Sequence, residues 1–347
     1  MTKFGFVDDY SEGAHPAVLA ALADTNARQE ATYGLDRFST EAAELIRGHL
    51  GGAKADIHFV PSGTIANTLC IASALRPHEA VIAATSGHIS VHETGAIEAT
   101  GHKVITVTPE NGKLTPDLIR RALAENAHFP HMAKPRMVYI SNATEVGTVY
   151  SLSELTAISG CCRENNLLLM LDGARIGAAV RASDVELADV AALADIFWIG
   201  GTKNGALLGE AVVIPNRELA QDFAFHVKQR GALLAKGRVL GVQFRALFTD
   251  NLYFSLADHA NAMATDLSKG VEAAGFKLLV PTQANQVFPV LTDPVVSQLR
   301  EKFDFHSWGR TESGDPVIRL VTSWATPQGR VQELLHTLTV YDRAAVG

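Results

Sequence analysis

Short apolar runs alternate with helical segments along the first two thirds of the chain, and this alternation limits the fold more than any other feature. Leu167–Leu171 and Asp195–Ile199 are two such runs, each followed by polar and glycine-rich residues. Strands that are apolar throughout are buried on both faces, as in parallel sheets covered by helices. The sequence therefore predicts an α/β fold in which a mostly parallel sheet is flanked by helices.

The alternation changes after residue 252. A long helix is expected over Ser255–Ala274, and shorter strands and two more helices follow. We therefore predict a large domain over residues 29–252 and a smaller α+β domain over residues 253–347. Residues 1–28 are expected to pack against the small domain.

Composition excludes several classes of function. Of the 347 residues, 47% are hydrophobic and 19% are charged, the balance of a soluble globular protein. The net charge of −7 offers no basic surface for nucleic acid, and no apolar run has the length of a membrane span or a signal peptide. The three cysteines are too few for a disulfide framework or a zinc site, so we expect them to be buried. We expect a cytoplasmic protein without a structural metal.

One lysine follows an apolar strand in a glycine-rich stretch. Residues 200–205 read Gly-Gly-Thr-Lys-Asn-Gly, with the lysine at position 203. A lysine in such a place either faces solvent or has a chemical role, because burying an unpaired ammonium group is costly. A desolvated lysine loses its proton more readily, and its neutral amine attacks carbonyl carbons. We interpret Lys203 as the residue that forms a Schiff base with pyridoxal 5'-phosphate.

Polar residues also follow other predicted strands, whose carboxyl ends meet at one edge of a parallel sheet. Ser62, Gly63 and Thr64 lie between a strand and a helix, where backbone amides bind phosphate, although Ser62 also suits a simple N-cap. Asp172 ends the Leu167–Leu171 strand. Its carboxylate either pairs with a protonated pyridine nitrogen or caps the following turn.

His88 and Arg319 are two further candidates. An imidazole at a helix start either stacks on a flat cofactor and moves protons, or has a structural role. Arg319 is a charge within an otherwise apolar strand. A strand arginine usually faces solvent, but its planar fork also suits a substrate carboxylate.

Taken together, five short motifs resemble the L-threonine aldolases. These enzymes belong to the aromatic amino acid beta-eliminating lyase/threonine aldolase group of fold type I pyridoxal-phosphate enzymes. The resemblance covers nearly the whole chain, in order and at compatible spacings. The motifs are Tyr33-Gly34-x-Asp36, Ser62-Gly63-Thr64, His88-x4-Glu93-x-Gly95-Ala96, Asp172-Gly173-Ala174-Arg175 and Thr202-Lys203-x-Gly205.

The resemblance implies a role for each matching residue around the cofactor. Lys203 carries the cofactor, Asp172 pairs with its pyridine nitrogen and His88 stacks on its ring. Ser62, Gly63 and Thr64 hold the phosphate.

For the substrate, the resemblance implies that Arg175 and Arg319 bind the carboxylate. It also implies a homodimer or homotetramer with sites at the subunit interface. Residues of one subunit then reach the neighbouring subunit's site: Tyr33 and a cation among Lys228, Arg230, Lys236 and Arg238.

Two departures from the family pattern concern catalysis. Many relatives have a histidine where this chain has Glu145, so the acceptor of the substrate's hydroxyl proton is Glu145, His88 or a water molecule. The family's early Ser-Asp pair falls by position on Val7 and Asp8, and Ser11 is the nearest hydroxyl. These changes resemble the branch with low specificity or phenylserine-type activity.

We therefore expect a pyridoxal-phosphate-dependent aldehyde-lyase. It would cleave L-threonine, L-allo-threonine or related β-hydroxy-α-amino acids such as phenylserine to glycine and an aldehyde. Two alternatives are a β-eliminating lyase that uses the same cofactor and a non-enzymatic ligand-binding α/β protein.

Overall fold

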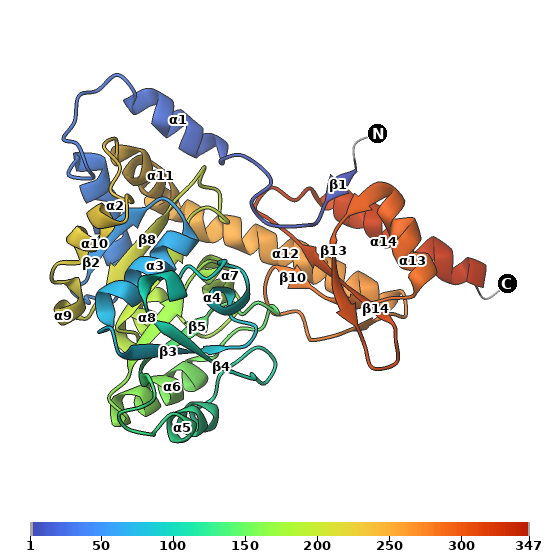
Figure 1. The fold of residues 1–347 in the computed structure, drawn as a ribbon. Helices are drawn as coiled ribbons and strands as arrows, with labels where there is room; N and C mark the ends of the chain where they lie inside the picture. Colours follow the sequence, from blue (N-terminus) through green and yellow to red (C-terminus); the bar gives the residue numbers. More distant parts are fainter. Residues whose placement is uncertain (1–2, 346–347) are drawn as a thin grey trace.

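A seven-stranded sheet forms the centre of the larger part of the molecule in the computed structural model, which describes residues 3–345 (Figure 1). Only β8 runs against the other strands of this sheet, so the predicted mostly parallel sheet is confirmed. In spatial order the strands are β2 (Asp56–Val60), β8 (Glu210–Ile214), β7 (Ile196–Gly200), β6 (Leu168–Asp172), β5 (Lys134–Ser141), β3 (Glu79–Ala84) and β4 (Lys103–Val107).

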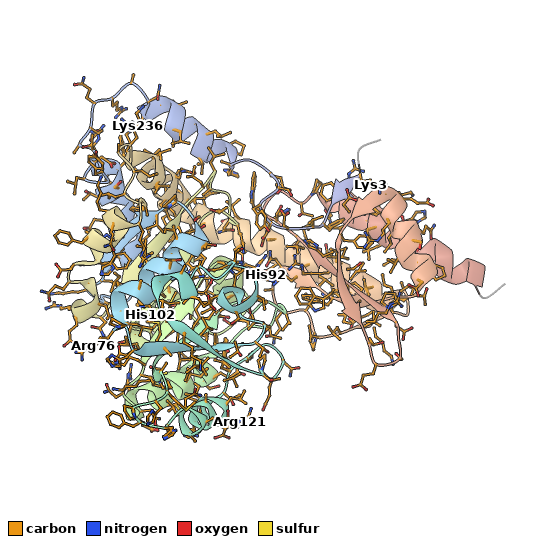
Figure 2. All side chains as sticks on the ribbon, viewed as in Figure 1. Lys3, Arg76, His92, His102, Arg121 and Lys236 are labelled. Carbon is orange, nitrogen blue, oxygen red and sulfur yellow. The ribbon has the colours of Figure 1, made fainter. Side chains whose placement is uncertain are left out.

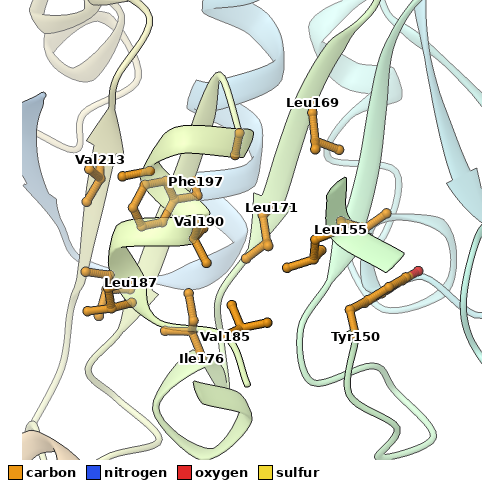
Figure 3. Packing of buried hydrophobic residues seen from close by; sticks show 14 of the residues in the cluster. Tyr150, Leu155, Leu169, Leu171, Ile176, Val185, Leu187, Val190, Phe197 and Val213 are labelled. Atoms are coloured by element: carbon orange, nitrogen blue, oxygen red, sulfur yellow. The ribbon is translucent and has the colours of Figure 1, made fainter. Parts of the chain in front are cut away.

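Helices cover both faces of this sheet, which explains why its inner strands are apolar throughout. Side chains of one strand alternate between two cores, because successive residues point to opposite faces. In β7, Phe197 and Ile199 belong to one core, whereas Ile196 and Trp198 belong to the other. Figure 3 shows the first core, where Phe197 packs near Val190.

Among the described helices, eight cover the first core and four cover the second. The first set comprises α1 (Pro16–Thr25), α2 (Arg37–Gly48), α5 (Pro116–Glu125), α6 (Leu152–Glu164), α7 (Ile176–Arg181), α8 (Leu187–Leu193), α11 (Arg238–Phe248) and the start of α12 (Leu252–Ala273). The second set comprises α3 (Gly63–Ala74), α4 (His88–Val91), α9 (Arg217–Ala220) and α10 (Phe223–Gln229).

The C-terminal part has its own small sheet and its own core. Helix α12 reaches from the large part to the small one, and α14 (Gln328–Ala345) packs against it (Figure 1). The remaining elements are β9 (Lys277–Leu278), β10 (Gln286–Val287), β11 (Pro289–Val290), α13 (Asp293–Lys302), β12 (Phe303–Asp304), β13 (His306–Arg310) and β14 (Pro316–Val321).

The N-terminal segment joins the two parts. Strand β1 (Phe4–Gly5) pairs with β12 in the small part, whereas α1 (Pro16–Thr25) packs against α11 in the large part (Figure 1). The chain between them crosses beside the carboxyl edge of the large sheet, since Tyr10 lines the cavity there. Domain boundaries at residues 28 and 252 stay a prediction.

Some predicted elements differ from those observed. From the sequence we expect one helix to hold His88, His92 and Glu93, but the observed helix α4, which begins at His88, ends at Val91, so Glu93 lies in the loop that follows. The sequence analysis did not predict α11 or β13. Strand β13 has an exposed, polar pattern, because it lies at the edge of the small sheet and pairs only with β14. None of the helices described here is long and apolar enough to cross a bilayer.

Candidate active site

A cavity of about 340 Å³ lies at the carboxyl edge of the large sheet. Eight of the predicted site residues line it, and they come from elements far apart in the sequence. These residues are Ser62, Gly63, Thr64, His88, Glu145, Asp172, Arg175 and Lys203. Tyr33, Lys228, Arg230, Arg238 and Arg319 are not among the residues that line it.

Lys203 lies in the loop that connects β7 to β8. The loop is held by Glu210, whose carboxylate accepts hydrogen bonds from the Gly201 amide (2.8 Å) and the Thr202 hydroxyl (2.8 Å). Burial lowers the pKa of Lys203, and the Arg175 guanidinium lowers it further, whereas Asp9, Asp172 and Glu210 act in the opposite direction. The amine is therefore shifted toward its neutral, nucleophilic form.

Asp172 ends β6 and is almost fully buried. Its Oδ2 accepts hydrogen bonds from the Tyr139 hydroxyl (2.5 Å) and the Asn67 side-chain amide (3.0 Å), and its Oδ1 accepts one from the Ala174 amide (3.0 Å). These donors fix the carboxylate at the edge of the cavity. The contact with Ala174 is the turn cap that the sequence suggested as an alternative, so Asp172 both caps the turn and lines the cavity.

The turn after Asp172 requires glycine. A Cβ atom at Gly173 would lie 1.8 Å from the backbone oxygen of Trp198, so no side chain fits between the two strand ends. This close approach brings the Asp172 strand end next to the loop that carries Lys203.

His88 follows β3 and Glu145 follows β5, two strands that lie on the other side of β6 from β7. The Nδ1 of His88 is 2.7 Å from Glu93 Oε1, and the His88 backbone amide donates to Glu145 Oε1 (2.9 Å). The Ser141 hydroxyl donates to the same Glu145 oxygen (2.7 Å). Burial raises the pKa of Glu145, which brings it closer to the range in which a carboxylate acts as a general base near neutral pH.

The first turn of α3 borders the cavity. Ser62 is the N-cap of this helix, and its hydroxyl accepts from the Ile65 amide at 3.5 Å. The N-cap alternative is therefore confirmed, and it is compatible with phosphate binding. Amides in a first helical turn have no partner within the helix and carry a partial positive charge.

Arg175 is already paired within the chain. Its Nε and Nη2 donate to the two oxygens of buried Asp9, at 2.7 and 3.0 Å, and Asn285 also donates to Asp9 (2.9 Å). Burial alone would raise the pKa of Asp9, but Arg175 lowers it below its usual value. This pairing uses the Nε edge of the guanidinium and leaves the N–H groups of Nη1 and the second N–H of Nη2 for a substrate. The contact of Arg175 with a carboxylate stays a prediction.

Arg319 is half-buried on β14 and lies near the same acidic segment. Its Nη2 donates to the Val7 carbonyl (3.3 Å), and its buried Nε has no hydrogen-bond partner among the residues described. Burial lowers its pKa, and Arg175 lowers it further. The usual solvent-facing placement of a strand arginine does not apply here, and its role in substrate binding stays a prediction.

The other predicted cations form a separate group away from the cavity. The Lys228 amine lies 4.8 Å from the centre of the Tyr33 ring, and Arg230 Nε is buried without a partner among the described residues. Arg238 donates to the backbone oxygens of Thr25 and Arg28. Figure 2 places the neighbouring Lys236 beside α1, far from His92.

The sequence analysis missed several residues that build the cavity, among them Asn67, Tyr139, Trp198 and Glu210. Period-2 alternation could have placed Tyr139, Trp198 and Asp172 on one sheet face, because each lies at an alternate position of an apolar strand. The sequence analysis also did not single out Asp9, the buried acidic residue of the N-terminal segment, whereas Asp8, on which the family's aspartate falls by position, is only partly buried. The three cysteines are free and buried, as predicted.

The donor set fits pyridoxal phosphate. One cavity holds a partly desolvated lysine, a fixed carboxylate, an imidazole and a helix N-terminus. These groups match an aldehyde, a pyridine nitrogen, a flat ring and a phosphate, respectively.

Comparison with known proteins shows extensive similarity. Residues 7–294 match the beta-eliminating lyase family model. The chain is 37% identical to a low specificity L-threonine aldolase of Pseudomonas aeruginosa, with 95% of each chain covered. A threonine aldolase structure from Leishmania major has a TM-score of 0.95 at 46% identity, covering 98% of this chain and 99% of the other. An aspartate aminotransferase of Thermus thermophilus, at 16% identity and a TM-score of 0.72 over 97% of this chain and 91% of its own, shares the fold.

Glu210 generates a prediction about stability, because burial raises its pKa to about 7 from an ordinary value of 4.5. A raised folded-state pKa gives stability that is present below the unfolded-state pKa and is lost as pH rises through the folded-state value. Between about pH 4 and pH 8, we expect the stability of wild type to fall by about 3 kcal/mol relative to Glu210→Gln. Urea unfolding of the cofactor-free protein measures this difference.

Exposed Glu218 provides the control, since Glu218→Gln should follow the pH dependence of wild type. If the free energies of unfolding of Glu210→Gln and wild type changed in parallel over this pH range, the Glu210 carboxylate would not have the raised pKa.

Proposed function

The chain belongs to the beta-eliminating lyase family, and from its similarity to low-specificity threonine aldolases we propose that it cleaves L-threonine to glycine and acetaldehyde. It is a pyridoxal-phosphate-dependent aldehyde-lyase of fold type I. L-allo-threonine and phenylserine are further candidate substrates of the same reaction.

One observation carries the proposal for the site: the Lys203 amine and the Asp172 carboxylate line the same cavity as the N-terminus of α3. When bound, pyridoxal phosphate accepts the electron pair of a bond that breaks at the substrate's α-carbon. Lys203 would bind its aldehyde carbon, Asp172 its pyridine nitrogen, and Ser62, Gly63 and Thr64 its phosphate. His88 would lie against the ring.

Two arginines would orient the substrate. Arg319 has an unpartnered Nε, and Arg175 keeps Nη1 free of Asp9. Charge-assisted hydrogen bonds to the substrate carboxylate would fix which bond at the α-carbon stands ready to break.

Glu145 would accept the proton of the substrate's β-hydroxyl group. Its carboxylate lines the cavity, is hydrogen-bonded on Oε1 and has a raised pKa. Removing the hydroxyl proton is what allows the Cα–Cβ bond to break with release of an aldehyde, and a carboxylate whose pKa is raised by burial suits this step.

A second copy of the chain would complete the phosphate end of the site. Among the described residues that line the cavity, Arg175 and Lys203 are the only arginine and lysine, and they are assigned to the substrate carboxylate and the cofactor aldehyde rather than to the phosphate. Arg238 is committed to backbone oxygens of its own chain, so Lys228 and Arg230 are the better candidates to reach a neighbouring site. This supports a homo-oligomer, at least a dimer.

Replacing Lys203 tests the core of the proposal. Lys203→Ala should lose the absorbance of lysine-bound pyridoxal phosphate and form no measurable glycine from L-threonine, because no other lysine of the described chain lines the cavity. The exposed control Lys54→Ala should keep both. Wild-type protein that released ammonia and a keto acid from threonine would instead be a β-eliminating lyase.

Replacing Glu145 tests the assignment of the base. Glu145→Gln should lower kcat by roughly a hundredfold, since general base catalysis contributes on that scale. Wild-type kcat/KM should fall as pH drops through the raised pKa of Glu145, and the variant should lack this fall. A variant with unchanged kcat and pH profile would move the role to His88 or water, whereas exposed Glu164→Gln should behave as wild type.

Mixing inactive variants tests whether subunits share sites. If Lys203 comes from one chain and Lys228 and Arg230 come from the other, the variants Lys203→Ala and Lys228→Ala/Arg230→Ala each make a pure dimer inactive. In a mixed dimer both lesions fall in the same site, and the second site is intact. An equal mixture should recover about a quarter of wild-type activity after subunit exchange. Lys203→Ala mixed with Asp172→Asn should recover none, because each substitution inactivates the site of its own chain and a mixed dimer then has no intact site. No recovery in the first mixture would mean that each chain builds its site alone.

A further inference from the structure

We propose that Asn67 is a positioning residue whose single amide group holds Asp172 and the His88–Glu93 pair as one rigid unit. This inference rests on the proposed function, because Asp172 and His88 act there on the cofactor. Asn67 belongs to α3, one turn after the residues assigned to the phosphate, and it is almost fully buried.

The orientation of the Asn67 amide follows from its neighbour on β7. The indole nitrogen of Trp198 lies 2.9 Å from Asn67 Oδ1, and an indole N–H can only donate. The oxygen must therefore face Trp198, and the NH2 group must face the other way. This removes the usual ambiguity between the two ends of an asparagine amide.

The NH2 group then donates to two carboxylates at once. Asn67 Nδ2 lies 2.7 Å from Glu93 Oε1 and 3.0 Å from Asp172 Oδ2. Each carboxylate is buried, and each receives one of the two protons of the amide. Without this group, two carboxylates would face each other at close range with no donor between them, which is unfavourable in a buried place.

The same contact determines how His88 presents its ring. Glu93 Oε1 also lies 2.7 Å from His88 Nδ1, so the neutral imidazole carries its proton on Nδ1. Its Nε2 is then the proton-accepting nitrogen. Asn67 thus holds the acid that orients His88 and the acid assigned to the pyridine nitrogen, although His88 and Asp172 come from separate elements.

Tyr139 provides a matched contrast. Its hydroxyl also donates to Asp172 Oδ2 and is also buried, but it has no hydrogen bond to Glu93. Replacing Tyr139 removes one hydrogen bond to Asp172 and leaves Glu93 unaffected. Replacing Asn67 removes the hydrogen bonds to both Asp172 and Glu93. The two variants therefore separate support of one carboxylate from coupling between two.

Affinity for pyridoxal phosphate is the first measurement, made by titrating the cofactor-free protein. Asn67→Leu should weaken binding by roughly tenfold or more, because it removes the one donor that lies between the buried Asp172 and Glu93 carboxylates. It should also change the absorption spectrum of the bound cofactor. The control is Asn261→Leu on α12, which removes a hydrogen bond to the Ala178 carbonyl and should change neither property.

Pairs of variants give the decisive test, with affinity and kcat/KM as the two quantities. Glu93→Gln and Asn67→Leu should be strongly non-additive, the double variant being little worse than the worse single variant. The effects of Glu93→Gln and Tyr139→Phe on affinity and on kcat/KM should instead be independent, so that the fold-changes of the two single variants multiply in the double variant. If Asn67→Leu does not fold, Asn67→Ala enters the same comparison.

Two outcomes would overturn the inference: wild-type affinity and spectrum in the folded Asn67 variant, or effects of Glu93 and Asn67 that simply multiply. A wild-type protein that binds no pyridoxal phosphate and forms no glycine would instead contradict the proposed function.

Discussion

The burial of the Asp172 carboxylate is the constraint on which the rest of the site depends. A buried charge is stable only where donors surround it, and Asp172 has donors from β5, α3 and its own turn. These donors must be placed precisely, which requires that the strands and α3 be fixed first. The large apolar sheet supplies that rigidity.

Period-2 alternation links the core to the chemistry. On one face of the sheet, Trp198 and Tyr139 extend an apolar core up to the strand ends, and their polar atoms point to Asn67 and Asp172. Each of these two side chains therefore serves both the core and the site: its ring packs in the apolar core, and its N–H or O–H donates a hydrogen bond within the site.

The N-terminal segment connects the cavity to the small part of the molecule. Asp9 fixes Arg175 and receives a hydrogen bond from Asn285, while β1 pairs with β12. The substrate end of the cavity is therefore built from both parts, whereas the Asp172 end belongs to the large part alone. Motion between the two parts would change the relative positions of Arg175 and Arg319 without changing the hydrogen bonds of Asp172.

The sequence alone determined the mostly parallel sheet, because strands buried on both faces must be apolar throughout. It also placed Lys203, Asp172, His88 and Ser62 at one edge of the sheet, because the carboxyl ends of parallel strands lie together. It could not determine pairings between side chains distant in the chain. Only the tertiary structure showed that Asp9 occupies the fork of Arg175 and that Asn67 joins Glu93 to Asp172. Such hydrogen bonds depend on distances of a few tenths of an ångström between elements, and no local pattern of residues encodes them.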